Sequence, residues 1–318
     1  MAAAAKVGGS PQDAKDAKEL LDKIGQQVYE TVKNGGAKTY KNKLKGNLAS
    51  ATSTSSETVD TDKTCTLVED YYNKPVNRER YPCKELSGEM GVKRFSDTLG
   101  GQCTNTKIKG NRYIERQDVG ACAPYRRLHL CHHNLESINT DKIDNTHKLL
   151  LEVCMAAKYE GELIRDYYTI YKETNQGTAS QLCTVLARSF ADIGDIVRGK
   201  DPFYGNTHES AQRKVLDKKL KEVFGKIHDD VTSGAQTRYK KDGGNYFQLR
   251  EDWWTANRET VWYAITCGAG TSDKYFRNTC SNDKAGTSGK CRCNDNQVPT
   301  YFDYVPQYLR WFEEWAED

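Results

Sequence analysis

Apolar residues recur at intervals of three to four positions over much of the second half of the chain. This spacing follows the turn of an α-helix and places the apolar side chains on one face. The stretches that show it span residues 149–171, 182–197, 216–227 and 249–265. Gly199 is the expected end of the second helix, and Asn245 is the expected cap of the fourth. Such helices pack their apolar faces together, so the pattern predicts a helical bundle.

A shorter helical pattern opens the chain. Ser10 and Pro11 are typical of an N-cap and a first helical position. Two apolar stripes follow, separated by Gly35 and Gly36, and they comprise Ala17, Leu20, Leu21, Ile24, Val28 and Val32 in the first and Ala37, Tyr40, Leu44 and Leu48 in the second. The sequence therefore predicts a helical hairpin over residues 1–48, whose apolar stripe docks on the rest of the chain.

The rest of the chain divides by composition. Residues 49–64 are rich in Ser, Thr and Asp and are interpreted as a linker. Three parts follow: a loop-rich part dense in Cys, Gly, Pro and Arg over residues 65–140, the bundle with a polar loop near its end over residues 141–297, and a terminal part over residues 298–318. Pro306 is expected to open a strongly aromatic helix in the terminal part.

Composition narrows the functional classes. Hydrophobic residues make up 37% of the 318 residues, and the mean hydropathy is −0.81. The net charge of +3 gives little overall attraction to nucleic acid, so no nucleic-acid partner is expected. No stretch approaches the roughly 20 apolar residues of a membrane span, and the first residues lack the apolar core of a signal peptide. Catalytic and phosphate-binding motifs are absent, so we expect no enzyme and no cofactor.

Cysteine is the residue whose distribution is most informative. All eleven cysteines lie in the last 254 residues, at Cys65, Cys83, Cys103, Cys122, Cys131, Cys154, Cys183, Cys267, Cys280, Cys291 and Cys293. Such a density predicts a disulfide framework, and the odd count leaves at least one cysteine without an intrachain partner. Zinc is the alternative, but the Cys291-x-Cys293 spacing is too close for the usual zinc pair. We therefore expect disulfides and no metal.

Three long strings identify a family. They are GACAPYRRLHLC at residues 120–131, LCTVLARSFADIGDIVRG at residues 182–199 and VPTYFDYVPQYLRWFEEW at residues 298–315. All three resemble the Duffy-binding-like alpha domain of Plasmodium falciparum erythrocyte membrane protein 1. The predicted hairpin of residues 11–48 resembles the N-terminal segment of that family. The periodicity within residues 182–199 favours a packing role for this motif, with Asp192 and Asp195 paired to neighbouring basic residues.

The resemblance implies a mainly α-helical, disulfide-stapled Duffy-binding-like fold. Its first subdomain is loop-rich and its second is a helical bundle, and a third would begin near residue 298. We then expect the partner of the odd cysteine to lie beyond Asp318. We also expect the aromatic face formed by Trp311, Phe312 and Trp315 to be uncovered.

The resemblance also implies a function. Family members are variant adhesins on the surface of the infected erythrocyte, anchored by a membrane span downstream and exported without a classical signal peptide. Expected partners are host cell-surface receptor proteins, sulfated glycans, the adjacent cysteine-rich domain of the same protein and host antibodies. Heparan sulfate-like glycans, blood-group sugars and complement receptor 1 are candidate ligands. The alternative is a structural, antigenically variable spacer that supports a neighbouring receptor-binding domain.

Basic residues supply the candidate glycan-binding sites. They form three sets, namely Lys214, Lys218 and Lys221 opposite the apolar stripe of one predicted helix, Lys38, Lys41 and Lys45 on one side of the second N-terminal helix, and Arg238, Lys240 and Lys241 in a loop. Several weak ionic contacts from such a set can hold a sulfated glycan. A solvated helix face is the alternative interpretation, because Asp217 and Glu222 dilute the positive charge.

Overall fold

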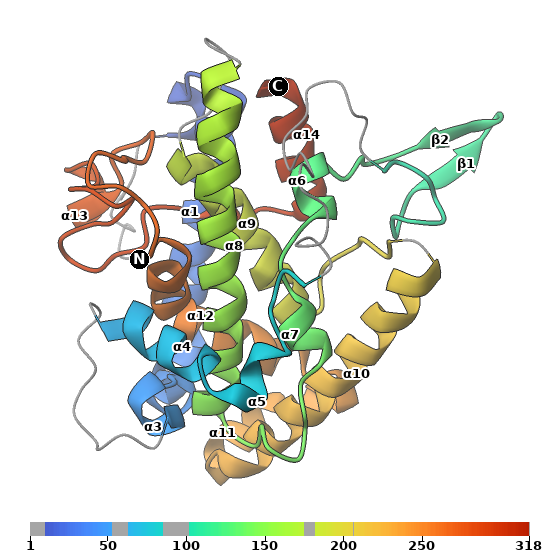
Figure 1. Ribbon diagram of the computed structural model, residues 1–318, viewed down its shortest axis with the longest axis vertical. Helices are drawn as coiled ribbons and strands as arrows, with labels where there is room; N and C mark the ends of the chain where they lie inside the picture. The colour runs from blue at the N-terminus through green and yellow to red at the C-terminus, as the bar shows by residue number, and fades with distance from the viewer. Residues whose placement is uncertain (1–9, 53–62, 85–101, 175–181, 206, 318) are drawn as a thin grey trace, which may run out of the picture.

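The computed structural model describes residues 10–52, 63–84, 102–174, 182–205 and 207–317 (Figure 1). The longer helices are α1 (Ala17–Lys33), α4 (Thr64–Tyr72), α8 (Thr146–Thr174), α9 (Leu182–Arg198), α10 (Thr207–Asp230), α12 (Phe247–Ile265) and α14 (Gln307–Glu317). The shorter helices are α2 (Lys41–Leu44), α3 (Leu48–Thr52), α5 (Pro75–Arg78), α6 (Tyr125–Leu128), α7 (His133–Glu136), α11 (Ser233–Tyr239) and α13 (Cys280–Asp283). Strands β1 (Arg112–Ile114) and β2 (Gln117–Val119) form an antiparallel hairpin.

The core lies where α8, α9 and α12 meet. In Figure 1, α8 runs along the long axis of the molecule, and both α9 and α12 contact it. The ring of Phe190 on α9 lies 5.1 Å from that of Trp254 and 5.2 Å from that of Trp262, both on α12. Gly161 permits close approach of α8 and α12, because a Cβ there would lie 1.9 Å from the carbonyl oxygen of Ile265. The predicted helical bundle is confirmed.

The predicted helices of the bundle agree with the structure except in detail. Gly199 ends α9 with a φ of +72°, as a glycine permits. Asn245 is not the cap of α12, because Tyr246 occupies that position and the Asp242 carboxylate accepts from the backbone N–H of Leu249 at 3.0 Å. The sequence did not predict α11, which follows α10 after a short break.

The N-terminal helix docks through a different face from the one predicted. Leu20, Ile24 and Val28, from the predicted apolar stripe, are 37%, 37% and 42% exposed. Polar residues are buried instead, and Asp22 is fully enclosed. The reason is a long-range ion pair: the Asp22 carboxylate accepts hydrogen bonds from Arg277 at 2.7 and 3.0 Å. The expectation that the stripe docks on the rest of the chain is therefore wrong for these three residues, whereas Leu21 packs against the main core.

A hairpin of two continuous helices is also absent from the N-terminal segment. Pro11–Asp13 is a separate 3₁₀ turn, and α1 begins at Ala17 with Asp16 as its cap. Beyond α1, a 3₁₀ turn over Gly36–Tyr40 leads into α2, and α3 follows as a further short helix. Leu44 and Leu48 are nevertheless buried in the main core as the stripe predicted.

Residues 65–140 contain more helix than the sequence indicated. Helices α4, α5, α6 and α7 interrupt the expected loops, and α4 packs against α8 and α12. The β1–β2 hairpin projects from the body in Figure 1, and every residue of both strands is exposed. The part of the predicted linker between residues 53 and 62 lies outside the described residues.

The motif at residues 182–199 is a packing element, as predicted. Residues 183–198 are all buried, and Asp192 accepts from Arg126 of α6 at 2.8 Å and from Arg310 of α14 at 2.7 Å. Burial raises the pKa of Asp192, but these two guanidinium groups outweigh it and hold the pKa at about 2. Asp195 is likewise paired, with Arg198 at 2.7 Å. The ion pairs therefore connect α6, α9 and α14.

The aromatic face of α14 is only partly uncovered. Phe312 is 73% exposed, and it lines a hollow of about 410 Å³ together with Tyr308 and Trp315. Trp311 is fully buried beside Ile108, however, so the expectation of an uncovered face is wrong for this residue. Trp315 is half-buried, and its indole N–H donates to the carbonyl oxygen of Cys122 at 2.9 Å.

Ten of the eleven cysteines form disulfides, all within the described residues. The pairs are Cys65–Cys267, Cys83–Cys131, Cys103–Cys122, Cys183–Cys291 and Cys280–Cys293. The disulfide interpretation is confirmed, as is the single unpaired thiol, which belongs to Cys154. Cys154 is fully buried in the main core, and burial raises the pKa of its thiol. The pairing of the odd cysteine beyond Asp318 stays a prediction, and the depth of the Cys154 sulfur in the core opposes it.

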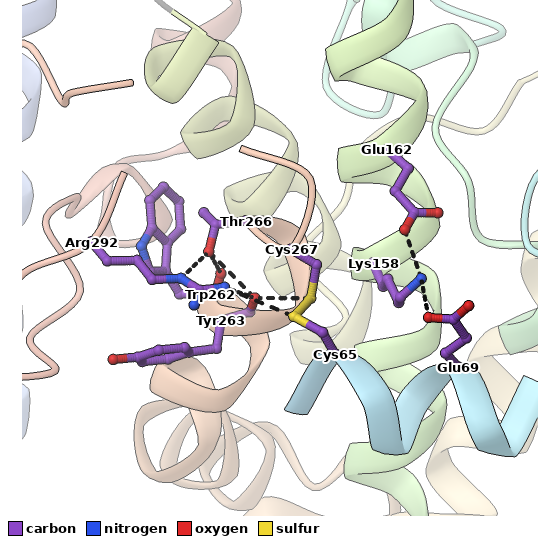
Figure 2. The surroundings of a disulfide bond; sticks show 9 residues. All are labelled: Cys65, Glu69, Lys158, Glu162, Trp262, Tyr263, Thr266, Cys267 and Arg292. Carbon is purple, nitrogen blue, oxygen red and sulfur yellow. Dashed lines mark hydrogen bonds and ion pairs between the residues drawn. A yellow bond between two sulfur atoms is a disulfide. The ribbon is translucent and has the colours of Figure 1, made fainter. Parts of the chain in front are cut away.

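Figure 2 shows how one of these disulfides is supported. The bond between Cys65 and Cys267 links α4 to the residues just after α12. Beside it, the Arg292 guanidinium lies 4.4 Å from the centre of the Tyr263 ring and donates to Thr266 Oγ1 at 2.8 Å. This disulfide closes 202 residues of sequence, so it greatly restricts the unfolded chain.

Candidate functional site

Helix α10 presents the first basic set at the surface. Its apolar positions Leu216 and Leu220 are buried, as the stripe predicted, and Lys214 and Lys218 are exposed. Within the described residues, neither lysine has an ion pair. Lys221 is the exception, because its Nζ lies 2.7 Å from a carboxylate oxygen of Asp217. The structure therefore leaves two of the three charges available to a ligand.

The second basic set does not lie on one helix as predicted. Lys38 lies in the 3₁₀ turn, Lys41 begins α2, and Lys45 follows the end of α2. Partial burial lowers the pKa of Lys41, and the neighbouring charge of Lys45 lowers it further. Lys45 lies 3.8 Å from a carboxylate oxygen of Glu259, which offsets part of its charge. This set therefore offers less free positive charge to a ligand than the set on α10.

The third basic set is likewise divided. The Arg238 guanidinium donates to Asp252 at 2.8 Å, so this residue anchors α11 to α12. Lys240 and Lys241 remain exposed in the following 3₁₀ turn. The structure therefore assigns Arg238 to packing and leaves the two lysines at the surface.

Four residues that the sequence did not single out join the α10 lysines at one groove. The groove has a volume of about 290 Å³, and the residues in question are Lys109, Arg213, Tyr204 and Phe247. Lys214 and Lys221 line it, whereas Lys218 is not among its lining residues. No sequence signal could have found this set, because it comes from three separate regions of the chain. Its members only become neighbours in the folded protein.

A buried cluster of charges lies beside the groove, which Asp201 and Arg213 also line. Asp201 accepts a hydrogen bond from Arg127 at 2.6 Å and is also paired with Arg213. Burial lowers the pKa of Arg213, and the charge of Arg127 lowers it further. The guanidinium of Arg127 lies 5.2 Å from the centre of the Phe203 ring. One carboxylate thus pairs with two guanidinium groups.

The described residues contain no cluster of metal-ligating side chains. Among them there is also no helix long and apolar enough to cross a membrane. Cys291 and Cys293, whose spacing was weighed for zinc, are both committed to disulfides. A disulfide-linked helical scaffold with a basic surface groove is typical of a binding module.

Comparisons with known proteins specify this class. The family model of the Duffy binding domain matches residues 120–310, and the model of the N-terminal segments of PfEMP1 matches residues 16–52. The chain therefore belongs to the Duffy binding domain family, in the form of the N-terminal segment and alpha domain of P. falciparum erythrocyte membrane protein 1. Its relatives are adhesion domains, and the chain is a binding module, not an enzyme.

Similar solved structures support the assignment. The NTS-DBL1-alpha and CIDR-gamma double domain of PfEMP1 from the P. falciparum varO strain is 36% identical, with a TM-score of 0.72; the match covers 95% of this chain and 43% of that one. A PfEMP1 DBL-beta domain bound to human ICAM-1 is 26% identical, with a TM-score of 0.64, and the match covers 98% of this chain and 63% of that one.

A curated relative is more distant. The Duffy receptor beta form of Plasmodium knowlesi is 23% identical over 255 residues, which cover 76% of this chain. The matched region is only 18% of the length of that receptor.

Proposed function

We propose that this chain is an adhesion module that binds host cell-surface molecules at the outer face of the infected erythrocyte. Family membership supports this proposal, and so does the relative whose DBL-beta domain is bound to human ICAM-1. Its partners are host receptor proteins or sulfated glycans, together with host antibodies. A CIDR-gamma domain accompanies the similar domain of the varO structure, so a cysteine-rich domain of the same protein is a further neighbour.

Sulfated glycans are the ligand class that the surface charge favours. The observation that carries this step is the pair of exposed lysines Lys214 and Lys218 on α10, which have no ion pair within the described residues. Lys221 adds a third charge on the same side of the helix. Each contact between an exposed lysine and a sulfate is weak in water, so affinity requires several together. A chain of repeated sulfate groups meets this requirement.

Heparin chromatography of the oxidised protein across a salt gradient tests the glycan proposal. The triple variant K214E/K218E/K221E is expected to elute at clearly lower salt than the parent, because it loses three cations and gains three anions. The matched control is K74E/K142E/K284E, which reverses three exposed lysines outside the basic sets. Both variants have the same net charge. A difference between them therefore reports position and not total charge.

The two triple variants separate the possible outcomes. Equal elution of parent and α10 variant would refute glycan binding through α10. An equal drop of the eluting salt concentration in both variants would show that heparin binding depends only on the net charge of the protein. A parallel screen of the parent against erythrocytes and receptor ectodomains tests adhesion itself. A protein that binds none of them would be the structural spacer instead.

A further inference from the structure

The groove beside α10 has a wall that is built by backbone pairing. Residues 107–109 run antiparallel to residues 202–204: the N–H of Lys109 donates to the carbonyl of Pro202 at 2.8 Å, and the N–H of Tyr204 donates to the carbonyl of Lys107 at 2.7 Å. Ile108 and Phe203 form the bridge between these two segments. In this register Lys109 lies opposite Pro202 and Tyr204 lies opposite Lys107. The pairing therefore fixes Lys109 and Tyr204 at diagonal positions of one short ladder, and both line the groove although they are far apart in sequence.

Helix α10 and the start of α12 form the other walls. α10 contributes Arg213, Lys214 and Lys221, and α12 contributes its first residue, Phe247. Phe247 is 48% exposed and Tyr204 is 37% exposed. Both line the groove. The groove thus combines two accessible aromatic rings with a basic wall.

The charges that line the groove do not cancel. Its cationic lining residues are Lys109, Arg213, Lys214 and Lys221, and its acidic ones are Asp201 and Asp217. Four positive charges against two negative ones leave an excess of two. The acids are engaged as well, because Asp201 pairs with Arg127 and Arg213, and Asp217 pairs with Lys221 and Arg250. Lys109 and Lys214 remain as the exposed cations that line the groove.

We propose that this groove binds one sulfated sugar residue of a glycan chain. Lys109 and Lys214 hold the sulfate, and Tyr204 and Phe247 pack against the apolar face of the sugar ring. The volume of about 290 Å³ lies at the lower end for ligand pockets, which suits a single residue of the chain. This inference rests on the proposed glycan binding and narrows it from a basic helix face to one site.

The proposed site distinguishes Lys214 from Lys218, although both lie on one side of the same helix. Lys214 and Lys218 lie on the same side of α10, yet only Lys214 lines the groove. A diffuse electrostatic surface would use both equally. A defined site requires Lys214 and the aromatic pair and does not require Lys218.

The test measures the dissociation constant of a heparin-derived hexasaccharide by calorimetry at several salt concentrations. The variant Y204A/F247A is expected to bind about five-fold more weakly with an unchanged dependence on salt, because aromatic packing involves no ion. K214E is expected to weaken binding and to reduce the salt dependence, and K218E is expected to do so far less. F312A is the control for loss of an exposed aromatic residue, because Phe312 lies on α14 outside the groove.

Two further arms identify the ligand chemistry. A desulfated hexasaccharide is expected to lose binding, and free inorganic sulfate at the same sulfate concentration is expected not to compete. K109Q tests the opposite wall by removing one charge, and circular dichroism verifies that each variant is folded. Competition by inorganic sulfate would overturn the sugar contact and reduce the groove to an anion site.

The outcomes distinguish this inference from the function on which it rests. Unchanged affinity in Y204A/F247A, with the triple lysine variant still defective, would overturn the groove and leave glycan binding by α10 intact. Equal losses in K214E and K218E would overturn it in the same way. A parent protein that binds no hexasaccharide at all would refute the proposed glycan function itself.

Discussion

Replacing Asp22 by alanine tests what holds the N-terminal segment on the domain. The Asp22 carboxylate is fully buried between α1 and the C-terminal part of the chain. It accepts hydrogen bonds from the backbone N–H of Tyr301 at 2.7 Å, from the Tyr275 hydroxyl at 3.1 Å and from Arg277 at 2.7 and 3.0 Å. Burial raises the pKa of Asp22 and opposes the attraction of Arg277. The pair is therefore maintained by its hydrogen bonds as well as its charge.

The expected cost follows from what each partner retains. Arg277 keeps a hydrogen bond to Gln26 at 2.9 Å, and Tyr275 keeps its bond to Thr300 at 3.0 Å. The buried N–H of Tyr301 loses its acceptor outright. Breaking a buried ion pair typically costs 3–5 kcal/mol, and the retained contacts place this case at the lower end. We expect D22A to lower the free energy of unfolding by about 3 kcal/mol.

Two assays detect the loss. Urea unfolding of the oxidised protein, followed by tryptophan fluorescence, reports the stability, and limited trypsin digestion reports release of the N-terminal segment at its lysines. Faster cleavage is expected in D22A because undocking exposes the backbone. The control E30A removes a partly exposed carboxylate 3.7 Å from Lys33 and is expected to lower the free energy of unfolding by under about 0.5 kcal/mol. Wild-type stability and cleavage in D22A would refute the reasoning and assign docking to apolar contacts.

Three further predictions concern the core. Native protein should give no reaction at Cys154 with a thiol reagent, and denatured protein should give one thiol per chain; a fast native reaction would contradict its burial. The pKa of Asp192 is about 2 in the folded protein against an ordinary 3.8, so its carboxylate should stabilise the fold by about 2 kcal/mol near neutral pH. This stabilisation should be lost as the pH falls from about 4 to about 2. The free energy of unfolding measured across that pH range tests the prediction. G161A should lower the free energy of unfolding by more than about 2 kcal/mol in denaturant titration, because the added Cβ would overlap the carbonyl of Ile265. G244A is the control: the space around Gly244 is open, so this substitution should leave the free energy of unfolding nearly unchanged.

The N-terminal helix shows where prediction from the sequence fails. Its apolar period is real, and it correctly indicated a helix over residues 17–33. The period cannot indicate which face docks, because that depends on partners outside the window. Arg277 lies 255 positions from Asp22, and its ion pair selects a polar face for burial. Gly25 assists, because a Cβ there would lie 2.2 Å from the carbonyl oxygen of Tyr301.

The sequence by itself determined the helices of the bundle, the disulfide chemistry, the packing role of residues 182–199 and the family. The helices and the packing role depend on local periodicity, and the disulfide chemistry depends on the number of cysteines. The family depends on three long motifs that can be recognised in the sequence alone. Only the tertiary structure decided that Cys154 is the unpaired cysteine, that Trp311 is buried and that Lys214 faces a groove while Lys218 does not. Each of these depends on which distant segments meet, and such contacts are set by the packing of the whole chain and not by any local pattern.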